Sequence, residues 1–158
     1  MKSHVLIIKA KNSHGVLGKI TNLLRRRMFN IEGMTAGYTN EKGISHVTVA
    51  FSGDEEFNAE QAKKQLSKII EVISVKELES NSVMREMALI RLHCSEKTKA
   101  PIFDAAKLFE GKIISVGDKS VVIEITGTPR RIDQFHDLVR GYGVKEFIRS
   151  SLIAVKED

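Results

Sequence analysis

The same order of elements occurs twice along the 158-residue chain. Apolar residues alternate in the segments we expect to be strands, and they recur every three or four positions in those we expect to be helices. Each half therefore has a strand, a helix, two strands, a second helix and a last strand. In the first half we expect strands over residues 3–10, 30–38, 44–51 and 72–78, and helices over residues 15–28 and from Asn58 onward.

The second half repeats this order without obvious sequence identity to the first. We expect strands over residues 84–94, 112–116, 119–126 and 144–155, and helices over residues 98–109 and from Thr128 onward. Thr128 and Pro129 suit the N-cap and the first position of that last helix. A βαββαβ order is typical of ferredoxin-like domains, so the predicted fold class is α+β, with two such domains. Each is expected to be an antiparallel sheet with its helices on one face, and the polar residues 79–82 divide them into 1–79 and 80–158.

The helices are expected to bury one apolar stripe each against their sheet. The stripes are Val16, Leu17, Ile20, Leu23, Leu24 and Met28 in the first helix, Ala62, Leu66, Ile69 and Ile70 in the second, and Ile132, Phe135, Leu138, Val139 and Tyr142 in the last. The opposite face of each sheet is left open, and we expect it to carry Thr48, Ala50, Val121 or Val122, and Ile125. A partner would cover these faces, unless the two halves cover each other.

A polar loop connects the first strand to the first helix, and it has the composition of a small anion site. The first N–H groups of a helix lack internal partners and carry partial positive charge. Gly15 has no Cβ, so a ligand can approach the backbone closely, and Asn12 adds both donors and an acceptor. A free amino acid needs such a combination for its carboxylate and ammonium groups. The alternative is that the loop merely turns the chain.

Catalytic and metal-binding chemistry is not indicated by the sequence. None of the five histidines has metal-ligand spacing to another His or Cys, and no phosphate-binding or dinucleotide motif occurs. Cys94 is the single cysteine, so no internal disulfide is possible, and we expect a small semi-buried side chain in a cytoplasmic protein. We therefore expect no catalytic residue and no metal site.

Charge and hydropathy argue against membrane and nucleic-acid partners. No apolar run approaches the ~20 residues that a membrane-spanning helix needs. The formal net charge is +5, but the excess of basic residues is spread along the chain and is weak evidence for nucleic-acid binding. We expect neither partner.

The motifs in both halves resemble one family, the small regulatory subunits of acetolactate synthase (acetohydroxyacid synthase). Residues Asn12–Leu17 and Phe29–Thr35 resemble the family's ACT domain, and Met84–Ile90, Phe109–Val116 and Glu124–Thr128 resemble its C-terminal domain. The sequence departs from the family pattern at two places. Met28 stands where a glycine usually precedes the aromatic residue, and Ser150-Ser151 replaces the more usual Ser-Gly or Thr-Gly.

The resemblance implies a non-catalytic subunit that forms a homodimer through its ACT domains and binds a branched-chain amino acid, usually valine, between them. It implies a large catalytic subunit as partner, carrying thiamine diphosphate, Mg²⁺ and FAD, with no cofactor in this chain. The small subunit would raise the activity of that partner and make it sensitive to feedback in valine, leucine and isoleucine synthesis. The effector-binding residues implied are Asn12, Ser13, His14, Gly15, Val16 and Leu17, with Asn30 and Ile31 contributed across the interface.

Other classes of function remain open at this point. A free-standing ACT-type amino-acid sensor could regulate another enzyme or transcription, although no helix-turn-helix segment is evident. A ferredoxin-like RNA-binding module would need paired aromatic residues on its central strands, and we find no such pair. An enzyme is the weakest alternative.

Overall fold

The structure is a computed structural model that describes residues 2–53, 59–78 and 82–156. It divides into two compact units: one holds the chain up to Val83 together with the residues from Leu152 onward, and the other spans Met84–Ser151. The predicted domain boundary at residues 79–80 and the predicted helix start at Asn58 lie outside the described residues.

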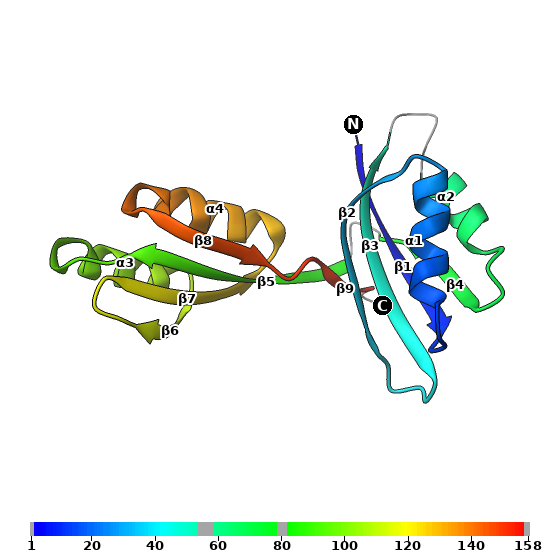
Figure 1. Cartoon of the computed structure of the whole chain (residues 1–158), viewed down its shortest axis with the longest axis horizontal. Helices are drawn as coiled ribbons and strands as arrows, with labels where there is room; N and C mark the ends of the chain where they lie inside the picture. Colours follow the sequence, from blue (N-terminus) through cyan, green and yellow to red (C-terminus); the bar gives the residue numbers. More distant parts are fainter. Residues whose placement is uncertain (1, 54–58, 79–81, 157–158) are drawn as a thin grey trace. The chain divides into compact units, whose positions relative to one another are not determined.

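The first unit has the predicted order of elements. It contains β1 (Lys2–Lys11), α1 (Val16–Arg26), β2 (Asn30–Tyr38), β3 (Ile44–Gly53), α2 (Ala59–Leu66) and β4 (Val72–Glu77). The sheet order is β2-β3-β1-β4, and every neighbouring pair is antiparallel. Both helices lie on one face of this sheet (Figure 1).

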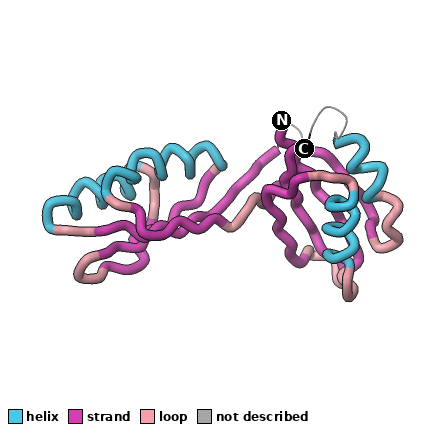
Figure 2. Tube along the Cα trace, turned by 45° about the horizontal axis from the view of Figure 1, so that its top comes forward, coloured by secondary structure: helices cyan, strands magenta, loops and turns pink. Residues whose placement is uncertain are grey.

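The second unit repeats the same topology. It is formed by β5 (Ser82–His93), α3 (Glu96–Leu108), β6 (Lys112–Val116), β7 (Ser120–Gly127), α4 (Pro129–Val139), the short 3-10 helix η1 (Arg140–Tyr142) and β8 (Val144–Arg149). Its order β6-β7-β5-β8 matches that of the first sheet position by position, and its helices again share one face (Figure 2). The Thr128 side chain accepts a hydrogen bond from the Arg131 N–H at 3.3 Å, which confirms the predicted cap of α4. The α+β fold with two ferredoxin-like domains is therefore confirmed.

Each unit has its own apolar core between sheet and helices. In the first unit the fully buried side chains include Leu6, Ile8, Ile20, Leu24, Val47, Val49, Phe51 and Leu66. In the second they include Ile90, Leu92, Ile102, Val121, Ile123, Ile132, Phe135 and Val139. Cys94 is buried at the edge of this second core.

On the open face of the second sheet, Ile125 was predicted wrongly, and of the alternatives Val121 and Val122 only Val122 lies there. Val121 and Ile125 point toward the helices and belong to the core, while Val122 alternates to the other face. Consecutive residues of a strand point to opposite faces, and Val121, Val122 and Ile123 are all apolar. The pattern along the strand therefore does not say which of these side chains face the helices.

Four residues assigned to buried helical stripes are exposed: Leu17 by 41%, Met28 by 81%, Ile70 by 89% and Leu138 by 47%. Met28 and Ile70 lie beyond the helices, because α1 ends at Arg26 and α2 ends at Leu66. Helical spacing therefore no longer applies to them. Leu17 and Leu138 lie inside their helices but outside the buried stripes, which are Val16, Ile20 and Leu24 in α1 and Ile132, Phe135 and Val139 in α4.

The predicted last strand over residues 144–155 is two strands. β8 ends at Arg149, and β9 (Ile153–Lys156) pairs with β5. The break coincides with Ser151, whose φ of 67° lies in the left-handed region and cannot continue a strand.

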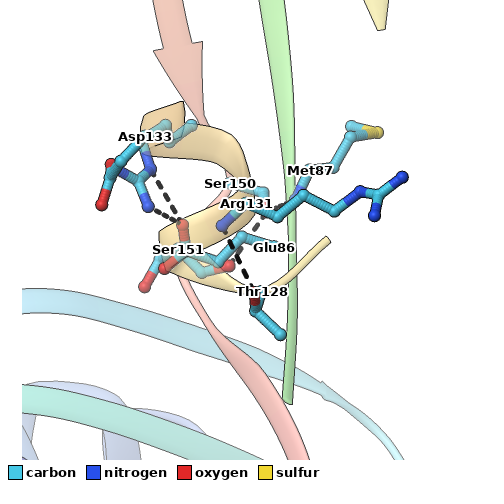
Figure 3. A network of polar contacts seen from close by, with 8 residues as sticks. Glu86, Met87, Thr128, Arg131, Asp133, Ser150 and Ser151 are labelled. Carbon is cyan, nitrogen blue, oxygen red and sulfur yellow. Dashed lines mark hydrogen bonds and ion pairs between the residues drawn. The ribbon is translucent and has the colours of Figure 1, made fainter. Parts of the chain in front are cut away.

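A polar network holds the chain at this break (Figure 3). The Arg149 guanidinium donates to Glu86 on β5 at 2.8 Å and to Asp133 on α4 at 2.6 Å. The Met87 N–H donates to the Ser150 hydroxyl at 3.0 Å. These bonds fix the end of β8 against both the sheet and the helix layer of its unit.

Part of the open face of the first sheet is covered within its own unit. Thr48 points away from the helices, because Val47 and Val49 on either side belong to the core, yet it is only 2% exposed. Leu152 and Ala154 are 4% and 5% exposed and belong to the same unit. Figure 1 draws β9 close to this sheet.

Candidate functional site

The loop between β1 and α1 is anchored to the turn between β2 and β3. The Asn12 N–H donates to the Gly43 carbonyl at 2.8 Å, and the Ser13 N–H donates to the Lys11 carbonyl at 3.0 Å. The polar residues of the loop thus have a fixed backbone, and they stand at the N-terminal end of α1.

Gly15 is the N-cap of α1, with a φ of 81°. This left-handed conformation favours glycine, and a Cβ built there would meet no atom within 4 Å. No side chain caps the helix start, and the first turn contains no acidic residue. Among the described residues, none accepts a hydrogen bond from the N–H of Leu17 or Gly18. The helix therefore presents free N–H donors and partial positive charge to this side.

A hollow of about 170 Å³ lies against this helix start. Its lining comprises Lys11, Asn12, Ser13, Gly15, Val16, Leu17 and Gly18, with Ala36 of β2 and Ser45 and Val47 of β3. The volume is below the ~300 Å³ at which drug-sized pockets begin, so it suits a small metabolite. Its lining combines polar residues of the loop with apolar side chains of α1 and the β2–β3 hairpin.

The structure brings most of the predicted effector residues together. Asn12, Ser13, Gly15, Val16 and Leu17 all line this hollow, whereas His14 is exposed and does not line it. Sequence reasoning missed Lys11 and Gly18 on either side of the predicted loop, and it missed Ala36, Ser45 and Val47 of the hairpin. The hairpin register, in which Ala36 lies opposite Val47, was the information needed to place them beside the loop.

Asn30 and Ile31 lie far from the hollow of their own chain. They begin β2 opposite Ser52 and Phe51, while the hollow adjoins the other end of that strand. The Asn30 amide donates to the Ser52 hydroxyl at 3.4 Å. The eleven residues of α1 separate the two ends by ~16 Å at about 1.5 Å per residue. One chain therefore does not bring all eight predicted residues into one site.

β2 is an edge strand. Within the described part of the chain it pairs with β3 alone, so its outer N–H and C=O groups face away from the sheet. The register shifts between Ile31 and Gly33, which marks a bulge near its start. Ala36, Gly37 and Tyr38 at its end are exposed, and Tyr38 is 87% exposed. An edge of this kind is a template for pairing with another strand.

Three titratable side chains near the β2–β3 hairpin, those of His46, Lys9 and Glu41, are either uncharged or joined in an ion pair. Burial, with a further contribution from the nearby Lys9, lowers the pKa of His46 below its ordinary value, so its imidazole is neutral at pH 7. The Lys9 ammonium donates to Glu41 at 2.7 Å. In residues 2–53, 59–78 and 82–156, no group of three His, Cys, Asp or Glu side chains is arranged to hold a metal ion. No helix in the same ranges is long and apolar enough to cross a membrane.

Two family models match the chain, one in each half of the sequence. Residues 6–74 match the acetohydroxyacid synthase small subunit-like ACT domain, and residues 85–158 match the small subunit of acetolactate synthase. The matched ranges follow the two βαββαβ repeats and include both the loop at Gly15 and the start of β2.

Curated relatives match over almost their full length. The chain is 38% identical to a probable acetolactate synthase small subunit of Archaeoglobus fulgidus over 96% of this chain and 95% of the relative. It is 36% identical to an acetolactate synthase small subunit of Mycolicibacterium smegmatis, over 97% of this chain and 90% of that one. The crystal structure of the acetolactate synthase small subunit from Thermotoga maritima superposes with a TM-score of 0.90 at 34% identity, covering 99% and 98% of the two chains.

The fold and the loop site define the class as an ACT-domain protein, built from an ACT domain and a second ferredoxin-like domain. More narrowly, the chain belongs to the acetolactate synthase small subunit family. Membership implies a large catalytic subunit as its partner.

Proposed function

We propose that this chain is the non-catalytic regulatory subunit of acetolactate synthase, which activates the catalytic subunit and makes it sensitive to feedback by valine or another branched-chain amino acid. The observation that carries the proposal is the hollow at the start of α1, open beside the unpaired edge of β2. Thiamine diphosphate, Mg²⁺ and FAD would belong to the catalytic partner, in the cytoplasm, and this chain would contribute no cofactor.

The hollow offers a partner for each part of an amino acid. The free N–H groups of Leu17 and Gly18 suit the carboxylate, because they are unpaired donors at the positive end of a helix. The Asn12 side chain supplies an oxygen acceptor for the ammonium group. Leu17 and Ala36, which are both exposed, provide apolar surface for a branched aliphatic side chain.

A homodimer would complete the site. If two β2 edges pair antiparallel about a two-fold axis near Gly33, the partner's Asn30 falls opposite Ala36, which lines the hollow. The exposed side of α1 beside this edge carries Gly18 and Thr21, and such small side chains permit close approach of a second helix. Asn30 and Ile31, which lie outside the hollow of their own chain, would then enter the hollow of the partner chain.

A ligand held between two chains favours their association by mass action. It would also select one dimer geometry over others, and the catalytic subunit would sense that change. Couplings between such sites are typically of about 1–3 kcal/mol.

Mixing the purified chain with its cognate large subunit tests the proposal through the rate of acetolactate formation. We expect no activity from this chain alone, a higher rate from the mixture than from the large subunit alone, and a loss of that rate when valine is added. Activity from this chain alone, or an unchanged rate in the mixture, would contradict the proposal.

A further inference from the structure

A second and larger hollow on the first unit lies between α1 and α2. It has a volume of about 530 Å³, and four of its lining side chains are basic, one is acidic and three are apolar. We call it the α1–α2 groove. None of its lining residues also lines the hollow at Gly15, although α1 contributes residues to both.

Only one of the four basic side chains is neutralised by a neighbour. Lys19 forms an ion pair with Glu71, and this hydrogen bond holds the pKa of the Glu71 carboxyl below its ordinary value. Arg26, Arg27 and Lys68 make no ion pair with any residue that the structure describes. Three positive charges therefore remain along the groove.

Apolar side chains lie between these charges. Leu23 and Ile69 are half-buried in the groove, and Ile70 projects from it with 89% of its surface exposed. An exposed isoleucine is commonplace by itself, but apolar surface rimmed by charge is typical of protein–protein contacts.

The donors in the groove do not form a phosphate cradle. The unpaired charges are carried by long side chains spread from the last turn of α1, at Arg26, to the turn after α2, at Lys68. A phosphate site would need converging donors, such as the N–H groups of a helix start. Separated charges around apolar surface match a polypeptide that carries carboxylates on either side of an apolar side chain.

The α1–α2 groove stays accessible in the proposed homodimer. Lys19, Leu23 and Arg26 recur at spacings of four and three and so share one flank of α1, which faces α2. Leu17 and Thr21 share the opposite flank, which adjoins β2 and the dimer edge. Occupants of the two flanks would not compete.

We infer that the α1–α2 groove docks an acidic segment of the catalytic subunit, with carboxylates against Arg26, Arg27 and Lys68 and an apolar side chain against Ile70. This inference rests on the proposed function, because it names the surface through which this chain binds its partner. The groove would place that partner on the same helix whose first turn holds the effector.

The experiment compares two doubly neutralised full-length variants for binding to the fluorescently labelled large subunit. Arg26→Gln with Lys68→Gln removes two charges from the groove. Lys99→Gln with Lys107→Gln removes two charges from the exposed side of α3 and serves as the matched control. We expect the groove variant to weaken binding by about tenfold or more and to flatten its salt dependence. The control should retain wild-type affinity and slope.

Calorimetry with valine on each variant separates this inference from the proposed function. We expect unchanged valine affinity in the groove variant, because the altered residues lie outside the hollow at Gly15. Ile70→Ser tests the apolar contact, and its 89% exposure means that the fold loses no buried surface. We expect it also to weaken binding of the large subunit.

Equal affinity of the wild type and the groove variant for the large subunit would overturn the inference and leave the proposed function intact. Failure of the wild-type chain to bind the large subunit would overturn both. If the groove variant lost binding to labelled double-stranded DNA while keeping its affinity for the large subunit, the groove would be a nucleic-acid surface and the inference would be wrong.

Discussion

Gly15 and Arg26 stand at opposite ends of one helix: Gly15 is the N-cap of α1, and Arg26 is its last residue. The hollow at Gly15 adjoins β2, whereas Arg26 lines the α1–α2 groove. An α-helix of this length moves as one body, so a ligand that shifts its first turn also moves its last. In the proposed function, α1 is therefore the direct physical link between the effector and the catalytic subunit.

Gly15→Asp should abolish valine binding and leave the fold in place. The new carboxylate would stand where the carboxylate of the ligand binds, and it would repel it. The side chain has room, since no atom lies within 4 Å of a Cβ at this position. The φ of 81° would cost about 1–2 kcal/mol for a residue other than glycine. Calorimetry with valine, alongside circular dichroism, measures both effects.

Two further variants separate charge from backbone strain. Gly143→Asp also places an aspartate at a positive φ, of 83°, in the second unit and should leave valine binding unchanged. Gly15→Ala keeps the strain at the site without the charge and should weaken binding less than the aspartate. Wild-type affinity in Gly15→Asp would show that the hollow is not the effector site.

Met28→Gly should stabilise the protein. Met28 has a φ of 59° and is 81% exposed, so the substitution relieves backbone strain and gives up little buried surface. Relief of about 1–2 kcal/mol, less the extra entropy of glycine in the unfolded chain, leaves a gain of roughly 0.5–1 kcal/mol in the free energy of unfolding. Urea denaturation measures it. Met28→Ala keeps the strain and should give no gain, so equal stability of both variants would refute this explanation.

Ser151→Gly should stabilise the second unit for the same reason. Ser151 has a φ of 67° between β8 and β9, and its side chain makes no hydrogen bond that the structure shows. We expect a gain of about 0.5–1 kcal/mol by denaturation. A loss of stability would mean that the serine contributes more than its backbone costs.

Arg149→Ala should destabilise the second unit by about 1–2 kcal/mol. This is less than the cost of breaking a fully buried ion pair, because Arg149 is partly exposed. Its removal leaves the carboxylate of Glu86, whose side chain is 11% exposed, without its partner. The control is Arg140→Ala, since Arg140 and Asp137 are 72% and 66% exposed and such a pair contributes at most about 1 kcal/mol. Equal losses in thermal unfolding would contradict this ranking.

The sequence predicted the repeated topology and the polar loop before α1 because both depend on local signals. The alternation of apolar residues predicts the strands, and their spacing of three and four predicts the helices. Asn12 and Gly15 indicate a polar turn before a helix. Met28 and Ser151, where this sequence departs from the pattern of the family it resembles, both have a positive φ that a glycine would adopt without strain.

The errors arose where the deciding information is not local. Ile70 keeps the spacing of the α2 stripe, but the helix ends four residues earlier, at Leu66. Val121 and Val122 are equally apolar, so only the packed sheet distinguishes their faces. Thr48 lies on the face away from the helices and is nevertheless buried, which its alternation along the strand does not predict.

Sedimentation velocity at low protein concentration, with and without valine, tests the shared site most directly. We predict that valine tightens the wild-type dimer and that Asn30→Ala loses both this shift and valine affinity. Asn30 is exposed, and toward the residues that the structure describes its side chain makes one hydrogen bond, of 3.4 Å, so its loss should spare the fold. Asn22→Ala, on the other flank of α1, should behave as wild type. A monomer that binds valine at full affinity, or an Asn30→Ala variant with wild-type affinity, would contradict a site shared between two chains.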